Sequence, residues 1–156
     1  MPASGLLYLP SGSVGDAHID STDPLSTNKV THQHAATYAQ ASAAVVADAT
    51  QLFYIARATG TIAAMKVAID TAPTGGDKAY TVDLKKSTGG GAFASILSAV
   101  VTVNSSSTSL TVVAGTLSTA TYAASDIFEI VVDASGSTGT QGYGVCVLVE
   151  FEEGTT

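Results

Sequence analysis

The sequence predicts an all-β fold, an antiparallel β-sandwich or barrel, preceded by an extended arm. From Gln51 onward, apolar or alternating runs typical of strands follow one another, separated by residues that favour turns. Residues 1–34 differ, because they are rich in Gly, Ser, Thr, Asp and Pro and show no period of 2 or 3.6. We therefore divide the chain of 156 residues into an extended N-terminal arm, residues 1–50, and a β-sandwich domain, residues 51–156.

About eight segments of the second part have the pattern of strands. In residues 61–70, for example, Met65 and Val67 alternate with Lys66 and Ala68, so one side of the strand faces the core. The predicted strands are residues 52–56, 61–70, 80–85, 95–98, 100–103, 110–113, 127–133 and 143–152.

Glycine-rich turns are expected at residues 73–77 and 87–91, because glycine adopts positive φ without a steric cost. The second of these lacks the lysine and hydroxyl of a phosphate-binding loop, so we interpret it as a flexible hairpin tip. The basic pair Lys85 and Lys86 at a strand end is expected to be solvated and to act as an edge guard, that is, to keep an edge strand from pairing with another chain.

The end of the arm leaves two alternatives open. Residues 34–50 are rich in alanine, which favours helix, and no Gly or Pro interrupts them. They also contain Thr37, Val45 and Val46 and lack Leu, Glu and Lys, which favours extended structure. We prefer the extended interpretation over the helical one.

The last predicted strand is apolar on both sides over its first half. Val145 and Val147 lie on one face, and Cys146 and Leu148 lie on the other. This pattern predicts a central strand whose outer face is covered by the arm or by another subunit. Cys146 is the only cysteine, which excludes a disulfide framework, and its aliphatic neighbours predict an inert, buried thiol.

Charge and composition exclude several classes of partner. Only 12% of residues are charged, while 46% are hydrophobic and the mean hydropathy is +0.32, which suggests a surface that is covered by something. The net charge of −7 argues against nucleic acid and against anionic membranes. The N-terminus shows no signal peptide, so we expect synthesis in a cytoplasm.

Histidines and clustered carboxylates occur in the arm. His32 and His34 would point the same way on a strand and could share a metal among three copies, but an exposed pair without a ligand is the preferred interpretation. Asp16, Asp20 and Asp23 lack the glycine and glutamate of a calcium loop, so a solvated acidic loop is expected. Residues 35–156 contain no histidine, which excludes a histidine-based triad there.

The remaining candidate carboxylates are expected on strand exteriors or in turns, where solvation explains them without chemistry. We therefore predict no catalytic, cofactor-binding or metal-binding residues, and no enzyme activity. The carboxylates considered are Asp70, Asp77, Asp83, Asp126, Glu129 and Asp133.

Five motifs occur in order: residues 59–67, TGTIAAMKV; 80–86, YTVDLKK; 95–98, SILS; 125–132, SDIFEIVV; and 142–150, GYGVCVLVE. Their order and spacing resemble the β-sandwich domain of tailed-bacteriophage virion proteins, over about two thirds of the chain. The resemblance implies a jelly-roll-like sandwich, often trimeric, as found in capsid decoration (cement) proteins and in head or tail fibre tips. It implies no catalytic residues.

The resemblance, the small size and the arm together predict a structural virion protein. We expect a capsid decoration protein on the capsid exterior that binds the major capsid protein as a homotrimer and stabilises the head. The alternative is a receptor-binding or fibre-tip module of a phage head or tail.

Overall fold

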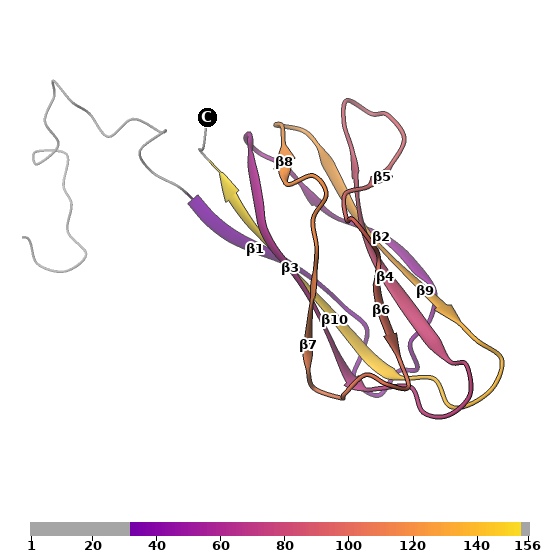
Figure 1. Ribbon diagram of the computed structural model, residues 1–156. Helices are drawn as coiled ribbons and strands as arrows, with labels where there is room; N and C mark the ends of the chain where they lie inside the picture. Colours follow the sequence, from indigo (N-terminus) through magenta and orange to yellow (C-terminus); the bar gives the residue numbers. More distant parts are fainter. Residues whose placement is uncertain (1–31, 154–156) are drawn as a thin grey trace, which may run out of the picture.

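The computed structural model describes residues 32–153, which form a sandwich of two antiparallel five-stranded sheets (Figure 1). These residues contain no helix, and hence none long and apolar enough to cross a membrane. The predicted all-β antiparallel sandwich is confirmed.

Sheet A has the strand order β1-β10-β3-β7, with β8 also paired to β3, and sheet B has the order β2-β9-β4-β5, with β6 also paired to β4. The two middle strands of each sheet, β10 and β3 in sheet A and β9 and β4 in sheet B, are called the central strands below, and the other six the outer strands. The bounds in chain order are β1 (His32–Ala39), β2 (Ala49–Ile55), β3 (Gly60–Thr71), β4 (Ala79–Ser87), β5 (Ala94–Ser95), β6 (Val101–Asn104), β7 (Val112–Gly115), β8 (Thr121–Tyr122), β9 (Ile127–Ser135) and β10 (Tyr143–Glu153).

The core lies between the inner faces of the central strands. Every second residue of these strands points inward, so the alternation seen in the sequence becomes a continuous apolar layer. Its fully buried side chains include Met65, Val67, Tyr80, Val82, Leu84, Phe128, Ile130, Val145, Val147 and Phe151.

The folded domain begins earlier in the chain than predicted. β1 pairs with β10 from the register pair His32↔Glu153 to Ala39↔Cys146, and β2 begins at Ala49. The predicted boundary between residues 50 and 51 is therefore wrong, because it falls inside β2. The extended alternative for the alanine-rich segment holds in β1, where small residues concealed the period of 2 and Tyr38 supplies the buried side chain. Residues 1–31, including Asp16, Asp20 and Asp23, lie outside the described residues.

β10 is a central strand, as predicted, lying between β1 and β3. The prediction of a buried Cys146 is wrong, because this residue is exposed. The strand alternation directs Val145 and Val147 into the core and therefore turns Cys146 to the outer face of sheet A.

The turn at residues 73–77 packs on the loop before β10. Gly76 has φ +61°, and a Cβ there would lie 2.2 Å from the Thr138 carbonyl oxygen, so glycine is required. Asp77 accepts hydrogen bonds from the Thr138 N–H at 2.7 Å, the Thr138 hydroxyl at 2.9 Å and the Ser137 N–H at 2.9 Å. These bonds lower the pKa of Asp77 to about 2.

Candidate interaction surfaces

A chain of hydrogen bonds ties the two sheets together where β1 begins. The Tyr54 hydroxyl donates to Glu153 Oε1 at 2.8 Å, and His34 Nε2 lies 2.6 Å from the same hydroxyl. Because the tyrosine proton is committed to Glu153, His34 Nε2–H acts as donor to the tyrosine oxygen. Burial, followed by the bond to Glu153, raises the pKa of Tyr54 well above its ordinary value.

Aromatic rings fill this end of the sandwich behind the hydrogen bonds. The Phe151 ring stacks on His34 with centroids 5.3 Å apart and lies 4.2 Å from Tyr54 and 5.3 Å from Phe128. Tyr122 meets Phe151 edge to face. Burial, with nearby Glu153, raises the pKa of Tyr122 to about 12. The cluster closes the core where β1 and β2 come together.

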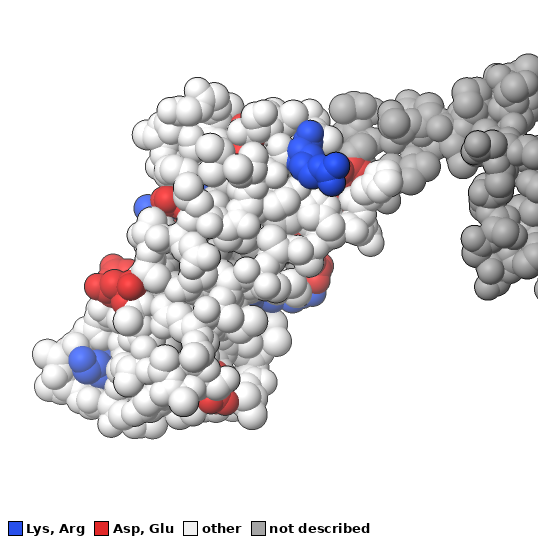
Figure 2. Space-filling model, turned by 180° about the vertical axis from the view of Figure 1, so that it is seen from behind, with Lys and Arg blue, Asp and Glu red and all other residues white. Residues whose placement is uncertain are grey.

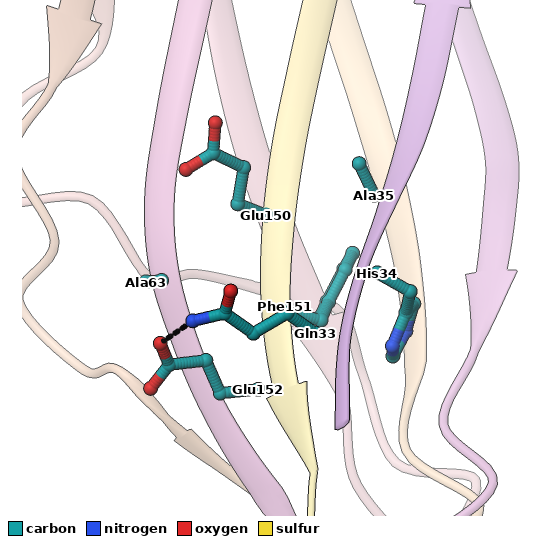
Figure 3. A pocket seen from close by; sticks show the side chains of 7 residues that line it. All are labelled: Gln33, His34, Ala35, Ala63, Glu150, Phe151 and Glu152. Atoms are coloured by element: carbon teal, nitrogen blue, oxygen red, sulfur yellow. Dashed lines mark hydrogen bonds between the residues drawn. The ribbon is translucent and has the colours of Figure 1, made fainter. Parts of the chain in front are cut away.

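Two open hollows flank β1 beside this cluster. The larger, about 700 Å³, is lined by residues that include His32, Arg57 and Glu153. The smaller, about 360 Å³, is shown in Figure 3, where Gln33 donates to Glu152 Oε1 at 2.7 Å beside Ala63. Both hollows are lined by residues near the two ends of the described chain, His32 to His34 and Glu152 or Glu153.

The two histidines are placed differently. His32 is exposed, whereas His34 is half-buried and bonded to Tyr54, so the interpretation as an exposed pair fits His32 alone. Within residues 32–153 no three His, Cys, Asp or Glu side chains gather as metal ligands. The metal hypothesis across three copies stays untested.

The candidate carboxylates lie in two kinds of environment, three at exposed or half-buried positions and three at buried positions. Asp77 and Asp133 are exposed, and Asp70 is half-buried, in agreement with the prediction. The prediction is wrong for the other three, Asp83, Asp126 and Glu129, which are buried.

Local partners explain two of these buried groups. The Ser95 hydroxyl donates to Asp83 Oδ1 at 2.6 Å, and Lys86 Nζ lies 3.3 Å from Asp126 Oδ2. The Ala123 N–H also donates to that oxygen at 3.0 Å. Burial alone would raise the pKa of Asp126, but these bonds and the lysine charge lower it overall. Lys86 therefore pairs with a buried carboxylate, and its prediction as a solvated edge guard is wrong, since β4 is a central strand.

Charge is distributed unevenly between the strands. All six outer strands lack Asp, Glu, Lys and Arg, whereas each central strand carries at least two of them. In Figure 2 the visible face is mostly white, with the charged side chains in isolated groups. The charged strand residues are Lys66, Asp70, Asp83, Lys85, Lys86, Glu129, Asp133, Glu150, Glu152 and Glu153.

The outer face of sheet A shows this contrast at close range. Lys66 Nζ and Glu150 Oε1 form an ion pair at 2.7 Å between neighbouring central strands. By register, the residues around that pair on β1, β10, β3 and β7 are mostly small and uncharged. They are Ala35, Thr37, Ala39, Ala68, Val112, Ala114, Cys146 and Leu148. The cover predicted over Cys146 and Leu148 is not supplied by residues 32–153, because Cys146 is exposed and Leu148 half-buried.

Seven large apolar side chains of the described residues are exposed, and five of them lie on or beside outer strands β2 and β7. The β2 patch consists of Leu52 and Ile55, and the β7 patch consists of Leu110, Val112 and Val113, while Val45 is bridged to Tyr143 and Val100 precedes β6. β1 contacts β2 and β6 contacts β7, so β2 and β7 lie at opposite edges of the sandwich. Large apolar patches on a soluble protein indicate interaction sites.

Leu110 is the most exposed member of the two patches. Its side chain is 78% exposed, and its φ of 58° is in the left-handed region that bulky residues avoid. Its N–H donates to the Ile69 carbonyl at 2.8 Å, which holds this backbone in place. Such strain costs on the order of 1–3 kcal/mol and is typical of functional positions.

Our sequence interpretation missed both patches, although one had a signal. No Asp, Glu, Lys, Arg or His occurs between Lys86 and Asp126, a stretch in which an average soluble sequence would hold about ten charges. This stretch contains β5, β6, β7 and β8 and therefore the whole β7 patch.

Comparison with known proteins adds no assignment. No protein-family model matches the chain, and neither a curated protein nor a solved structure matches it.

Proposed function

We propose that this chain is a structural virion protein, a capsid decoration protein with a jelly-roll-like sandwich that binds the outer surface of a phage head and stabilises it. The resemblance of its strand motifs to phage virion β-sandwiches gives the class of protein. The observation that carries the proposal is the placement of its apolar surface. Five exposed large apolar residues lie on or beside outer strands β2 and β7, and all six outer strands lack Asp, Glu, Lys and Arg.

This surface suits a protein that must attach at many equivalent positions. Contacts between uncharged side chains are little affected by ionic strength, whereas exposed ion pairs weaken as salt rises. Two separate patches provide for two kinds of neighbour, copies of the chain itself in a homotrimer and the major capsid protein. The outer face of sheet A, where small uncharged residues surround the Lys66–Glu150 ion pair, adds further area for the shell.

The first test is the number of copies in purified particles of the phage that encodes the chain, measured by quantitative mass spectrometry against the major shell protein. A decoration protein is expected at hundreds of copies, in a fixed ratio to the shell protein. A handful of copies would instead support a fibre-tip or receptor-binding module. Absence from the particle would overturn the virion assignment.

A second measurement tests attachment directly. Full-length protein added to particles that lack it should co-sediment with them, and should remain bound in about 1 M salt, where the Debye length is about 3 Å. Release at high salt would show that charge, rather than the apolar surface, holds the chain.

A further inference from the structure

We infer that residues 6–9, LLYL, dock in a hollow on the outer face of sheet A of their own chain, beside Cys146. The Lys66–Glu150 ion pair does not line this hollow, so that part of the face remains for the shell. The inference concerns a contact within one chain and does not rest on the proposed function.

The hollow has a volume of about 420 Å³ and runs across sheet A. Ala39 on β1, Cys146 on β10 and Ala68 on β3 line it, in the order in which these strands lie side by side (Figure 1). Leu110, which precedes β7 and is 78% exposed, also lines it. Small side chains on three neighbouring strands and one large exposed leucine therefore form a depression that a short apolar segment can fill.

β10 is the central strand that this hollow leaves uncovered. Its inner residues Val145 and Val147 are fully buried, whereas Cys146 between them is exposed among residues 32–153. A central strand with an apolar outer face favours cover by another segment or another molecule. Docking of residues 6–9 supplies that cover.

The charge of its lining separates this hollow from the two that flank β1. Glu150 and Glu152 line one of those, and Arg57 and Glu153 line the other. Asp70 is the only Asp, Glu, Lys or Arg that lines the hollow beside Cys146. An uncharged apolar segment therefore fits this hollow best, because covering charged groups with apolar side chains costs desolvation energy.

The sequence holds one segment of that kind before His32. Residues 6–9 are four consecutive apolar residues, and residues 1–15 contain no Asp, Glu, Lys, Arg or His. Four consecutive large apolar residues favour aggregation when water surrounds them, so cover within the chain is favourable. The other aliphatic residues between positions 10 and 31 that are larger than alanine stand singly, and they are Val14, Ile19, Leu25 and Val30.

The length of the connection allows the run to reach the hollow of its own chain. β1 begins at His32, and the hollow lies beside its last residue, Ala39. The distance along β1 between these two residues is about 23 Å, at about 3.3 Å per residue. His32 lies 23 positions after Leu9, and a chain of that length spans up to about 75 Å when fully extended. A tethered segment has an effective concentration on the order of 1 mM, which favours it over another copy at micromolar concentration.

Cys146 reports on this docking, because it is the only cysteine of the chain. Full-length protein is treated with the neutral reagent N-ethylmaleimide, and the labelled fraction is followed over time by mass spectrometry. Leu6→Ser/Leu7→Ser/Leu9→Ser should react at least about tenfold faster than wild type, because a docked segment restricts access to the thiol. Equal rates for this variant and wild type would show that residues 6–9 do not cover Cys146, and would overturn the inference.

The matched control replaces three apolar residues outside the run. Val14→Ser/Ile19→Ser/Leu25→Ser should react with N-ethylmaleimide at the wild-type rate. A control that reacts as fast as the run variant would also contradict the inference, because protection would then not depend on residues 6–9. Circular dichroism checks the fold of each variant.

Disulfide trapping tests the contact and its connectivity. Under mild oxidation, full-length Leu7→Cys should form an intramolecular disulfide with Cys146 several-fold faster than Ile19→Cys does, measured on non-reducing gels and by peptide mapping. Equal rates for the two variants would refute docking of the run at this hollow. Covalent dimers in place of the bridged monomer would show that the run docks on another copy, which overturns the contact within one chain. Both experiments use the isolated chain, so their outcome is independent of attachment to particles.

Discussion

The central and outer strands of the sandwich differ in where they place charge and apolar side chains. Central strands β3, β4, β9 and β10 bury one face completely and carry every Asp, Glu, Lys and Arg found in the described strands. The outer strands supply fewer core side chains and lack charge altogether. A sandwich selected only for solubility as a monomer would show the opposite distribution.

The two groups of strands meet two different requirements, folding of the chain and contact with other molecules. The central strands determine whether the chain folds, because their alternation creates the core. The outer strands determine what the folded chain meets, because their unpaired sides and exposed apolar residues face outward. Substitutions in the two groups should therefore affect different measurements.

The largest expected effect is a core truncation in a central strand. Phe151→Ala removes a fully buried ring that touches His34, Tyr54, Tyr122 and Phe128, and should lower the free energy of unfolding by about 3–5 kcal/mol. Leu52→Ala on outer strand β2 should change it by less than about 0.5 kcal/mol in the monomer.

Urea denaturation of both variants measures this contrast, at a dilution where light scattering shows a single chain. Comparable losses for the two substitutions would show that β2 contributes to the core as much as β10 does, and the division into central and outer strands would fail.

A smaller loss of stability is expected from breaking the ion pair between Lys86, on central strand β4, and Asp126. Asp126 is 2% exposed and Lys86 17% exposed, so Asp126→Asn leaves a largely buried lysine without its counter-charge and should cost about 2–3 kcal/mol at pH 7. The pKa of Asp126 is lowered in the folded protein, so its charged form stabilises the fold above the unfolded value of about 4. That contribution is lost as the pH falls through the lowered pKa.

The pH dependence should therefore differ between the two proteins. Wild type should lose more stability than Asp126→Asn as the pH falls from about 5 to 2, measured by thermal unfolding. Asp77, with a pKa of about 2, acts with the same sign but is present in both proteins, so their difference isolates Asp126. Parallel curves would show that the ion pair does not stabilise the fold.

The same division explains what could be predicted from the sequence. β3, β4, β9 and β10 were predicted because strict alternation over many residues has few other interpretations. β1 was predicted only as extended structure of the arm, because its alanines hide the period of 2 that would mark a sheet strand, and β8 was missed because it has only two residues, Thr121 and Tyr122. The burial of Asp83 and Asp126 depends on partners from other segments, Ser95 and Lys86, which the local pattern does not reveal.

The candidate surfaces were predictable only in part. The uncharged stretch before Asp126 is visible in the sequence and indicates a covered region. The position of its apolar residues on one side, opposite Leu52 and Ile55, follows from the strand order of two sheets, which a single sequence does not specify.

The smallest expected effect should separate folding from assembly at one residue. Leu110→Gly relieves a strained φ of 58° and removes a side chain that is 78% exposed, so it should raise the stability of the monomer by up to about 1 kcal/mol. The same substitution removes the most exposed part of the β7 patch and should weaken self-association, measured by sedimentation velocity over a concentration series.

Leu110→Ala is the matched control, because alanine keeps the cost of positive φ while removing most of the side chain. It should weaken association as Leu110→Gly does, without the gain in monomer stability. If both variants associate like wild type, Leu110 does not lie in the contact, and its strain requires another explanation. If Leu110→Gly loses monomer stability, the exposed leucine supports the fold of its own chain and belongs functionally with the central strands.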